Sequence, residues 1–222
     1  MTTAEDHQPP LTALQVDADA LAPAETETAT FGMGCFWGPD ARFGAMPGVV
    51  RTRVGYAGGT APNPSYYSLG DHTEVVQVEY VPETLAYEDL LDVFWANHNP
   101  FSAAHKRQYR GVVLAHDDGQ RAAADASAAA LEDRTGKAVA TAVESLDSFT
   151  LAEKYHQKYE LRSTPVLGAE FEDIYGPALV DSTAAARLNG FVAGHGDPDQ
   201  REAVLAAVEL TPAALSELER RL

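Results

Sequence analysis

The stretch Phe31-Gly32-Met33-Gly34-Cys35-Phe36-Trp37-Gly38 decides how the chain can fold and which chemistry it can carry. An apolar run over residues 28–33 predicts a buried strand before it, and residues 36–45 predict a short helix after it. Cys35, the only cysteine among 222 residues, therefore falls at a strand-to-helix junction. Unpaired N–H groups and the positive dipole end at a helix N-terminus favour a thiolate. The stretch predicts a nucleophilic cysteine rather than an inert buried one.

The apolar patterns on either side of this stretch predict the rest of the fold. Strands are predicted over residues 49–56, 73–81, 110–115 and 139–144, and helices over residues 84–98, 120–134 and 152–160. The first six elements have the order β-α-β-β-α-β, which is typical of an α+β, ferredoxin-like split β-α-β sandwich. Further helical patterns over residues 182–193, 200–209 and 212–222 predict a C-terminal helical extension.

These patterns divide the chain into three parts. Residues 1–27 have no apolar period and predict a flexible N-terminal arm. Residues 28–165 hold all the predicted strands and form the predicted catalytic domain. Residues 166–222 form the predicted helical extension.

The composition limits the partners and the location of the protein. Its 33 acidic and 16 basic side chains give a formal charge of −17. Such a surface repels nucleic acid and anionic membranes, disfavours self-association at low salt, and suits a salt-rich cytoplasm. The sequence shows no secretory signal and no apolar run of membrane-spanning length. We therefore expect a cytoplasmic, salt-adapted monomer, and the scattered histidines predict no metal site.

A thiolate that attacks an oxidised sulfur needs an acid to protonate the departing oxygen. Glu74 stands at the start of a predicted strand beside His72 and Val75, where burial would raise the pKa of its carboxyl. Tyr66, Tyr67 and Tyr109 can donate hydrogen bonds to a polar oxygen. These side chains are the candidates for the rest of the site.

Seven ordered blocks carry a resemblance to a known family. They are Gly-Cys-Phe-Trp-Gly at 34–38, Gly-Tyr-Ala-Gly-Gly at 55–59, Asn-Pro-Ser-Tyr at 63–66, His-Thr-Glu-Val-Val at 72–76, Phe-Trp-Ala-Asn-His at 94–98, Gln-Tyr-Arg at 108–110 and Ala-Glu-Lys-Tyr-His-Gln-Lys-Tyr at 152–159. Over residues 30–162 the chain resembles the A-type peptide-methionine (S)-S-oxide reductases. The resemblance implies a ferredoxin-like α+β fold and reduction of the S epimer of methionine sulfoxide, free or in oxidised proteins, without metal or organic cofactor.

The resemblance also implies roles for individual residues. Cys35 matches the nucleophile that becomes a sulfenic acid, and Glu74 matches the acid that protonates the sulfoxide oxygen. Tyr66 and Tyr109 match the tyrosines that bind that oxygen.

Three further residues are candidates for substrate binding. Phe36 and Trp37 match the apolar wall around the S-methyl group, for which sulfur–aromatic contacts are favourable. His72, next to the acid, is the third.

The chain departs from the family pattern in three places. The loop between Tyr66 and Glu74 is shorter than usual, so Tyr67 is an alternative to Tyr66. A supporting aspartate is replaced by Ala104, with Ser102, His105 or Lys106 as possible substitutes. Resolving cysteines are absent from this sequence, so the sulfenic acid must react with an external thiol, either a small thiol or a thioredoxin-like protein.

Two other functions fit the same residues. Cys35, His72 and Glu74 could form the triad of a cysteine hydrolase, because residues two apart on a strand share one face. Alternatively, oxidation of Cys35 could alter how the C-terminal helices dock, as in a non-catalytic redox sensor.

Overall fold

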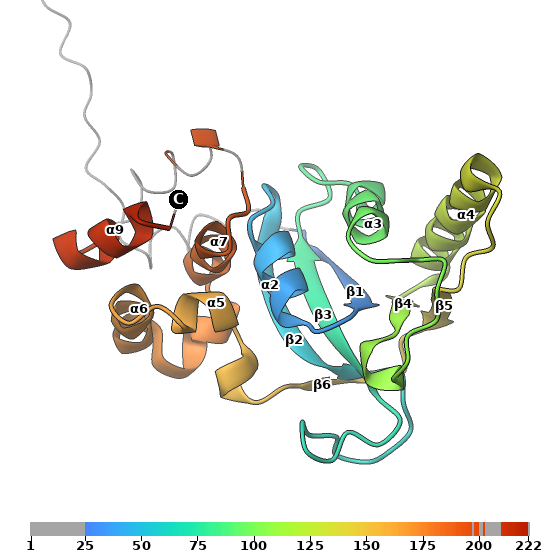
Figure 1. Ribbon diagram of the computed structural model, residues 1–222, viewed down its shortest axis with the longest axis horizontal. Helices are drawn as coiled ribbons and strands as arrows, with labels where there is room; N and C mark the ends of the chain where they lie inside the picture. Colours follow the sequence, from blue (N-terminus) through green and yellow to red (C-terminus); the bar gives the residue numbers. More distant parts are fainter. Residues whose placement is uncertain (1–24, 197, 200–201, 203–209, 222) are drawn as a thin grey trace, which may run out of the picture.

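A six-stranded sheet forms the centre of the computed structural model, which describes residues 25–196, 198–199, 202 and 210–221 (Figure 1). The strands are β1 (Glu27–Met33), β2 (Val49–Ala57), β3 (Thr73–Tyr80), β4 (Gly111–Ala115), β5 (Ala142–Ser145) and β6 (Phe149–Leu151). Their spatial order is β5-β4-β1-β3-β2-β6. Neighbouring strands are antiparallel except β4 and β5, which are parallel. The fold is therefore α+β, with strands β4-β1-β3-β2 forming an antiparallel centre.

Strands β2 and β3 pair as an antiparallel hairpin. Val54 lies opposite Val76 and Tyr56 lies opposite Glu74. The alternating valines of these strands are buried on the sheet, which explains why a period of two was visible in the sequence. The long loop between the strands carries Tyr66 and ends beside Glu74.

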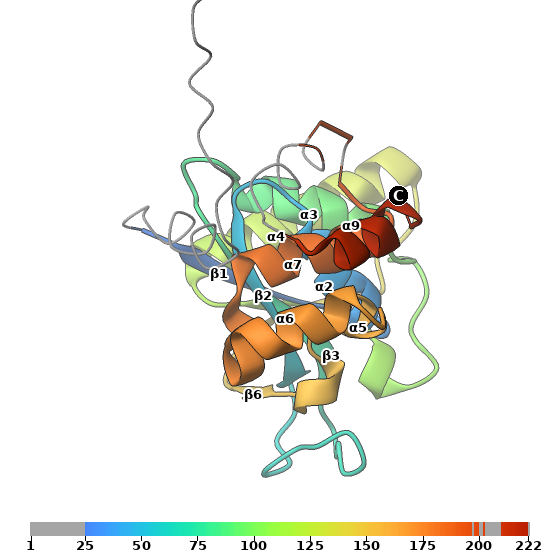
Figure 2. The ribbon, with the colours of Figure 1, turned by 90° about the vertical axis from the view of Figure 1, so that its left-hand side faces the viewer.

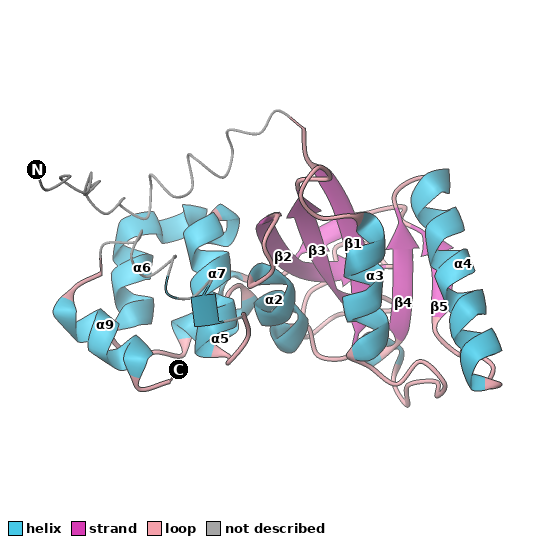
Figure 3. Ribbon diagram, turned by 90° about the horizontal axis from the view of Figure 1, so that it is seen from above, coloured by secondary structure: helices cyan, strands magenta, loops and turns pink. Residues whose placement is uncertain are grey.

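Three helices cover one face of the sheet: α2 (Trp37–Gly44), α3 (Tyr87–Ala96) and α4 (Asp118–Thr135) (Figure 3). Phe31 of β1 lies between them, with its ring 5.4 Å from Phe43 of α2 and 5.2 Å from Phe94 of α3. Each buried Phe of this kind stabilises the fold by about 1.5–3 kcal/mol. This aromatic contact fixes α2, and with it the segment that carries Cys35, against the sheet.

The C-terminal helices meet the rest of the fold mainly where α5 and α7 pack against α2, and α7 also contacts β2 (Figure 2). They are α5 (Tyr159–Arg162), α6 (Leu167–Tyr175), α7 (Thr183–Val192) and α9 (Pro212–Glu219), and they share an apolar core of their own. Helices α2 and α7 cross at Gly190 of α7. A Cβ atom at this position would clash with the backbone oxygen of Ala41 in α2. Small residues therefore let the C-terminal helices approach the helix that follows Cys35 closely.

Several sequence expectations need correction. The helix predicted over residues 152–160 is instead the 3-10 turn η2 (Lys154–His156) followed by α5. Lys158 breaks it with a φ of 52°, because its backbone N–H and its ammonium group both bind the buried Asp40. Strand β6, helix α6 and the 3-10 turns η1 (Arg107–Tyr109) and η3 (Gly176–Asp181) were not predicted.

Other boundaries moved or lie outside the described residues. The predicted arm ends earlier than residue 27, since Glu27 already belongs to β1, and residues 1–24 lie outside the described part. The predicted helix over 200–209 also lies almost wholly outside it. The strand predicted over 139–144 begins only at Ala142. Among the helices that the structure describes, none is long and apolar enough to cross a membrane.

Candidate active site

Cys35 is exposed and lies just before α2, as the sequence predicted. Gly34 has a φ of 103°, a conformation that favours glycine and that turns the chain out of β1. The backbone N–H of Trp37 hydrogen-bonds to the thiol and lowers its pKa, but burial together with the nearby charge of Glu74 raises the pKa overall. The helix N-terminus thus favours the thiolate through the N–H of Trp37, and burial opposes this effect.

Glu74 is nearly fully buried, with 1% of its surface exposed. Its Oε2 accepts a hydrogen bond of 3.2 Å from the backbone N–H of Phe36, the residue after Cys35. Its Oε1 accepts a bond of 2.7 Å from the side-chain amide of Gln108. Burial raises the pKa of Glu74 although both hydrogen bonds lower it. The carboxyl is thus prepared to hold a proton next to the thiol.

Tyr109 lies in η1 beside this carboxyl. Burial raises the pKa of its hydroxyl, and the charges of Glu74, Tyr66 and Cys35 raise it further. Gln108, next to Tyr109, binds Glu74, which also binds the backbone of Phe36, and Tyr66 packs on Phe36. The structure thus brings together the segments that carry the four predicted catalytic side chains.

Tyr66 is held by a residue that the sequence analysis did not select. Its backbone N–H donates a 3.0 Å hydrogen bond to Oε1 of Glu153, whose Oε2 accepts a 2.7 Å bond from the hydroxyl of Tyr56. Tyr66 packs on the aromatic cluster around Phe36, whereas Tyr67 is 90% exposed. The geometry thus favours Tyr66 over Tyr67 for the site.

Phe36 and Trp37 form an apolar wall next to the thiol. Phe36 is buried and packs 6.0 Å from the ring of Tyr56. Trp37 is half-buried and stacks on Tyr159 at 3.7 Å with an interplanar angle of 3°. Aromatic faces of this kind suit a small apolar group such as a thioether methyl.

His72 stabilises the loop between β2 and β3 that carries Tyr66. It is 3% exposed, precedes β3, and its Nε2 lies 2.8 Å from the carbonyl oxygen of Ala61 in the same loop. A hydrolase triad would need this ring to contact Cys35. Its Nε2 is engaged by the loop backbone, and its buried Nδ1 has no hydrogen-bond partner among the described residues. The loop is closed further by Asp71, which accepts hydrogen bonds from the N–H groups of Thr60 and Ala61.

Two residues of the site were missed, Gln108 and Glu153. Both lie inside the sequence blocks that carry the family resemblance, at 108–110 and 152–159. The sequence therefore marked these two residues but assigned them no role. Ser102, His105 and Lys106, the candidates to replace the missing aspartate, are all exposed. The structure instead supplies Gln108 as the side-chain partner of Glu74.

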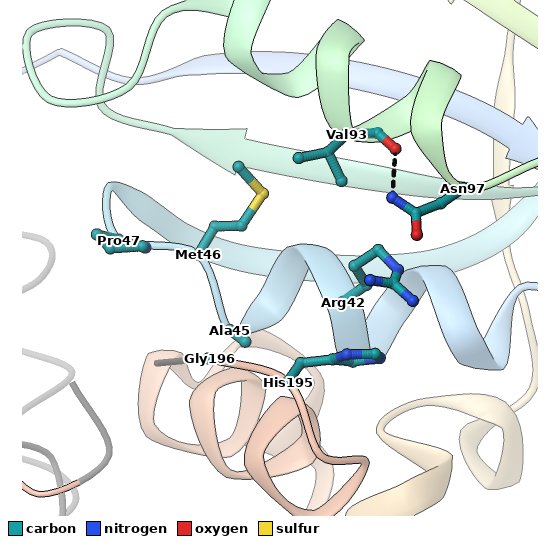
Figure 4. A pocket seen from close by; sticks show the side chains of 8 residues that line it. All are labelled: Arg42, Ala45, Met46, Pro47, Val93, Asn97, His195 and Gly196. Atoms are coloured by element: carbon teal, nitrogen blue, oxygen red, sulfur yellow. Dashed lines mark hydrogen bonds between the residues drawn. The ribbon is translucent and has the colours of Figure 1, made fainter. Parts of the chain in front are cut away.

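A separate pocket of about 350 Å³ lies at the other end of α2 (Figure 4). It is lined by Arg42, Ala45, Met46, Pro47, Val93, Asn97, His195 and Gly196. Arg42 is seven residues beyond Cys35, about 10 Å away at the helical rise of 1.5 Å per residue. This pocket is therefore not the thiol site. Within the described residues, no group of three His, Cys, Asp or Glu side chains could hold a metal ion.

Comparison with known proteins gives one consistent result. The family model described as peptide methionine sulfoxide reductase matches residues 27–171. A peptide methionine sulfoxide reductase of Drosophila melanogaster is 42% identical over 187 residues, which cover 83% of this chain and 76% of the relative. Peptide methionine sulfoxide reductase A5 of Oryza sativa subsp. japonica is 36% identical over 196 residues, 86% of this chain and 77% of the relative.

Solved structures agree with the sequence relatives. Reduced Mxr1 of Saccharomyces cerevisiae superposes with a TM-score of 0.60 at 28% identity, covering 64% of this chain and 88% of that one. Methionine sulfoxide reductase A of Corynebacterium diphtheriae superposes with a TM-score of 0.58 at 28% identity, covering 70% and 82%.

Proposed function

Because the chain belongs to the A-type peptide methionine sulfoxide reductase family, we propose that it reduces the S epimer of methionine sulfoxide through a sulfenic acid on Cys35. Membership makes the chain an oxidoreductase that acts on methionine sulfoxide and repairs oxidised proteins. The epimer, the nucleophile and the acid are what the proposal adds.

The proposed first step is an oxygen transfer between two sulfurs. The sulfur of Cys35 attacks the sulfoxide, whose S–O bond breaks as the oxygen passes to the cysteine. Glu74 donates its proton to the oxygen and regains one from the thiol. The products are methionine and the sulfenic acid of Cys35, so the cysteine is oxidised by two electrons and the sulfoxide is reduced by two. Tyr66 and Tyr109 donate hydrogen bonds to the oxygen as negative charge develops on it.

The observation that carries this proposal is the hydrogen bond from the backbone N–H of Phe36 to Glu74. It joins the segment of the nucleophile directly to a buried carboxyl whose pKa burial raises. An acid that burial biases toward its protonated form, hydrogen-bonded to the residue after the only cysteine of the sequence, suits a reaction whose leaving oxygen must be protonated.

The second half of the proposed cycle depends on external thiols. The sulfenic acid reacts with one thiol to give a mixed disulfide and water, and a second thiol then releases Cys35 with a new disulfide. Support comes from the sequence, which holds no second cysteine. A small thiol or a thioredoxin-like protein can fill this role, on free or protein-bound substrate. Omitting both must stop the enzyme after one turnover.

The proposal includes a fold assignment. We assign residues 28–165 to a ferredoxin-like split β-α-β catalytic domain and residues 166–222 to a helical extension. The antiparallel order β4-β1-β3-β2, with β3 between β1 and β2, supports the first part. The apolar core around α6, α7 and α9, to which residues 28–165 contribute Ala45 and Leu161, supports the second.

The proposal also includes a salt-rich cytoplasm and a monomeric state, supported by the formal charge of −17. Unfolding measured from dilute buffer to molar potassium chloride tests the salt adaptation. Equal stability throughout would argue against it. Sedimentation at several salt concentrations tests the monomer.

The decisive experiment is a single turnover without added thiol. Stoichiometric reduced protein is mixed with the separated S and R epimers of a blocked methionine sulfoxide, and thioether is counted per Cys35. We expect about one equivalent from the S epimer and none from the R epimer or from Cys35→Ser. No thioether from either epimer would overturn the proposed reaction. One oxidation that excess thiol fails to reverse would instead support the redox sensor.

A further inference from the structure

His156, a residue without a role in the proposed chemistry, lies among the side chains that form the substrate wall. It belongs to η2, is 1% exposed, and comes from a segment about 120 positions after Trp37 in the chain. Its ring lies 5.0 Å from that of Phe36, 5.8 Å from that of Trp37 and 4.7 Å from that of Tyr66. One imidazole therefore contacts three of the predicted site residues.

The contact with Trp37 is directional. The indole Nε1 of Trp37 donates a 3.1 Å hydrogen bond to Nδ1 of His156. Because an indole nitrogen can only donate, Nδ1 must be the unprotonated nitrogen of the ring. The proton of the neutral imidazole is thereby assigned to Nε2, which is buried and makes no hydrogen bond to any residue of the described chain.

Trp37 has a second constraint on its ring. It stacks face to face on Tyr159 at 3.7 Å. Stacking fixes the plane of the indole but does not fix how far the ring slides across that of Tyr159. The hydrogen bond to His156 removes this remaining freedom, so the two contacts together define where the indole edge lies beside Cys35.

Only the neutral ring can make this contact. A proton on Nδ1 would face the indole N–H with a second donor, and the hydrogen bond would be lost. Burial lowers the pKa of His156, and the nearby charge of Glu153 opposes that shift. Of the described groups facing the ring, Glu153 lies 4.0 Å from Nε2, and the rings of Tyr66 and Tyr155 pack beside it. The ring is therefore neutral at neutral pH and becomes charged in acid.

We propose that His156 is a positioning residue that holds Trp37 in register against the methyl group of the substrate, and that it releases Trp37 when it takes up a proton. The inference rests on the proposed function, because it concerns the pocket for the sulfoxide. Its effect falls on substrate binding, because the imidazole contacts the wall of the pocket. Acid should thus raise KM before it lowers kcat.

Two variants separate positioning from packing. His156→Leu removes the acceptor for the indole and leaves a similar volume. His156→Asn places an amide oxygen near the position of Nδ1 and cannot titrate. Losing one hydrogen bond of this kind should raise KM about fivefold to tenfold in the Leu variant. The Asn variant should restore KM and flatten its dependence on pH.

Fluorescence supplies a readout that needs no activity. The chain has two tryptophans, and Trp95→Phe leaves Trp37 as the single emitter. Emission from Trp37 should then follow one titration below the usual range of histidine, and this titration should vanish in His156→Leu and His156→Asn. Emission that does not change between pH 4 and pH 7 would overturn the proposal, even if the Leu variant failed to fold.

The measurement of KM can contradict the proposal independently of the fluorescence titration. A KM in folded His156→Leu within twofold of the parent value would also overturn the proposal. If the parent protein makes no thioether in a single turnover, the proposed reaction fails, yet the fluorescence titration still tests the contact between His156 and Trp37. The two failures are therefore distinguishable.

Discussion

The side-chain amide of Gln108 donates a 2.7 Å hydrogen bond to Glu74. This bond stabilises the charged carboxylate and lowers the pKa of Glu74, while burial raises it and prevails. Gln108 therefore limits how far the pKa of Glu74 is raised.

Replacing Gln108 by Leu should move the pH profile. Without the amide, the pKa of Glu74 rises further, so the acid stays protonated to higher pH. The alkaline limb of the pH profile of kcat/KM, which reports the ionisation of Glu74, should therefore shift to higher pH. Gln77→Leu, on the same strand as Glu74, is the matched control and should leave the limb in place. An unchanged profile in Gln108→Leu would show that the limb belongs to another group.

Glu74→Gln should separate stability from activity. The amide cannot supply a proton, so single-turnover reduction should slow by about 10²–10⁴-fold. Because the folded-state pKa of Glu74 is raised above 4.5, the folded protein resists its ionisation. The wild-type protein therefore loses stability as the pH rises through the window between the unfolded and folded pKa values, and Gln avoids this loss.

Denaturant unfolding at several pH values checks this sign. The variant should equal the wild-type protein in acid and exceed it at neutral and alkaline pH. A variant less stable than wild type across the whole range would mean that the Glu74 hydrogen bonds outweigh the cost of burial.

Tyr66 and Tyr67 offer a matched pair. Tyr66→Phe removes one donor to the sulfoxide oxygen and should lower the single-turnover rate about 10–100-fold, as for loss of a hydrogen bond to a developing charge. Tyr67 is 90% exposed, so Tyr67→Phe should retain the wild-type rate. Rapid-quench measurement of thioether formation checks both. The reverse order of effects would transfer the oxygen-binding role to Tyr67.

The sequence predicted the local parts of this site well. Cys35 at the strand-to-helix junction follows from apolar periods and glycines that lie within ten residues of it. The choice of Glu74 as the acid follows from its place at the start of a predicted strand, beside His72 and Val75. Each of these features depends on neighbours in the chain, which a single sequence displays directly.

The contacts between segments far apart in the chain could not be predicted from the sequence. Glu153 binds the backbone of Tyr66 across 87 positions, and no period in either segment indicates that bond. The break at Lys158 likewise depends on Asp40, 118 positions away, so the apolar pattern alone predicted a continuous helix. Strand β6 has three residues and is recognisable only by its pairing with β2. Tertiary contacts, rather than local conformational propensity, determine all three of these features.

The buried pair of Lys158 and Asp40 should be essential for stability. Both side chains are fully buried, and the ammonium group lies 3.0 Å from Oδ1 of Asp40 and 2.6 Å from the carbonyl of Thr52. Burial lowers the pKa of Lys158, and the carboxylate opposes that shift. Lys158→Met leaves Asp40 as a buried charge without its cation and should cost about 3–5 kcal/mol.

The neighbouring Lys154 is the control for this variant. Its ion pair with Glu172 is exposed on the lysine side, so Lys154→Met should cost no more than about 1 kcal/mol. Adding Asp40→Asn to Lys158→Met removes the stranded charge, and the double variant should recover part of the lost stability because the two residues are coupled. Chemical unfolding of the wild type, Lys158→Met, Asp40→Asn and the double variant measures this coupling. Additive losses would show instead that the two charges contribute independently, and that packing rather than the ion pair joins α2 to the segment beyond η2.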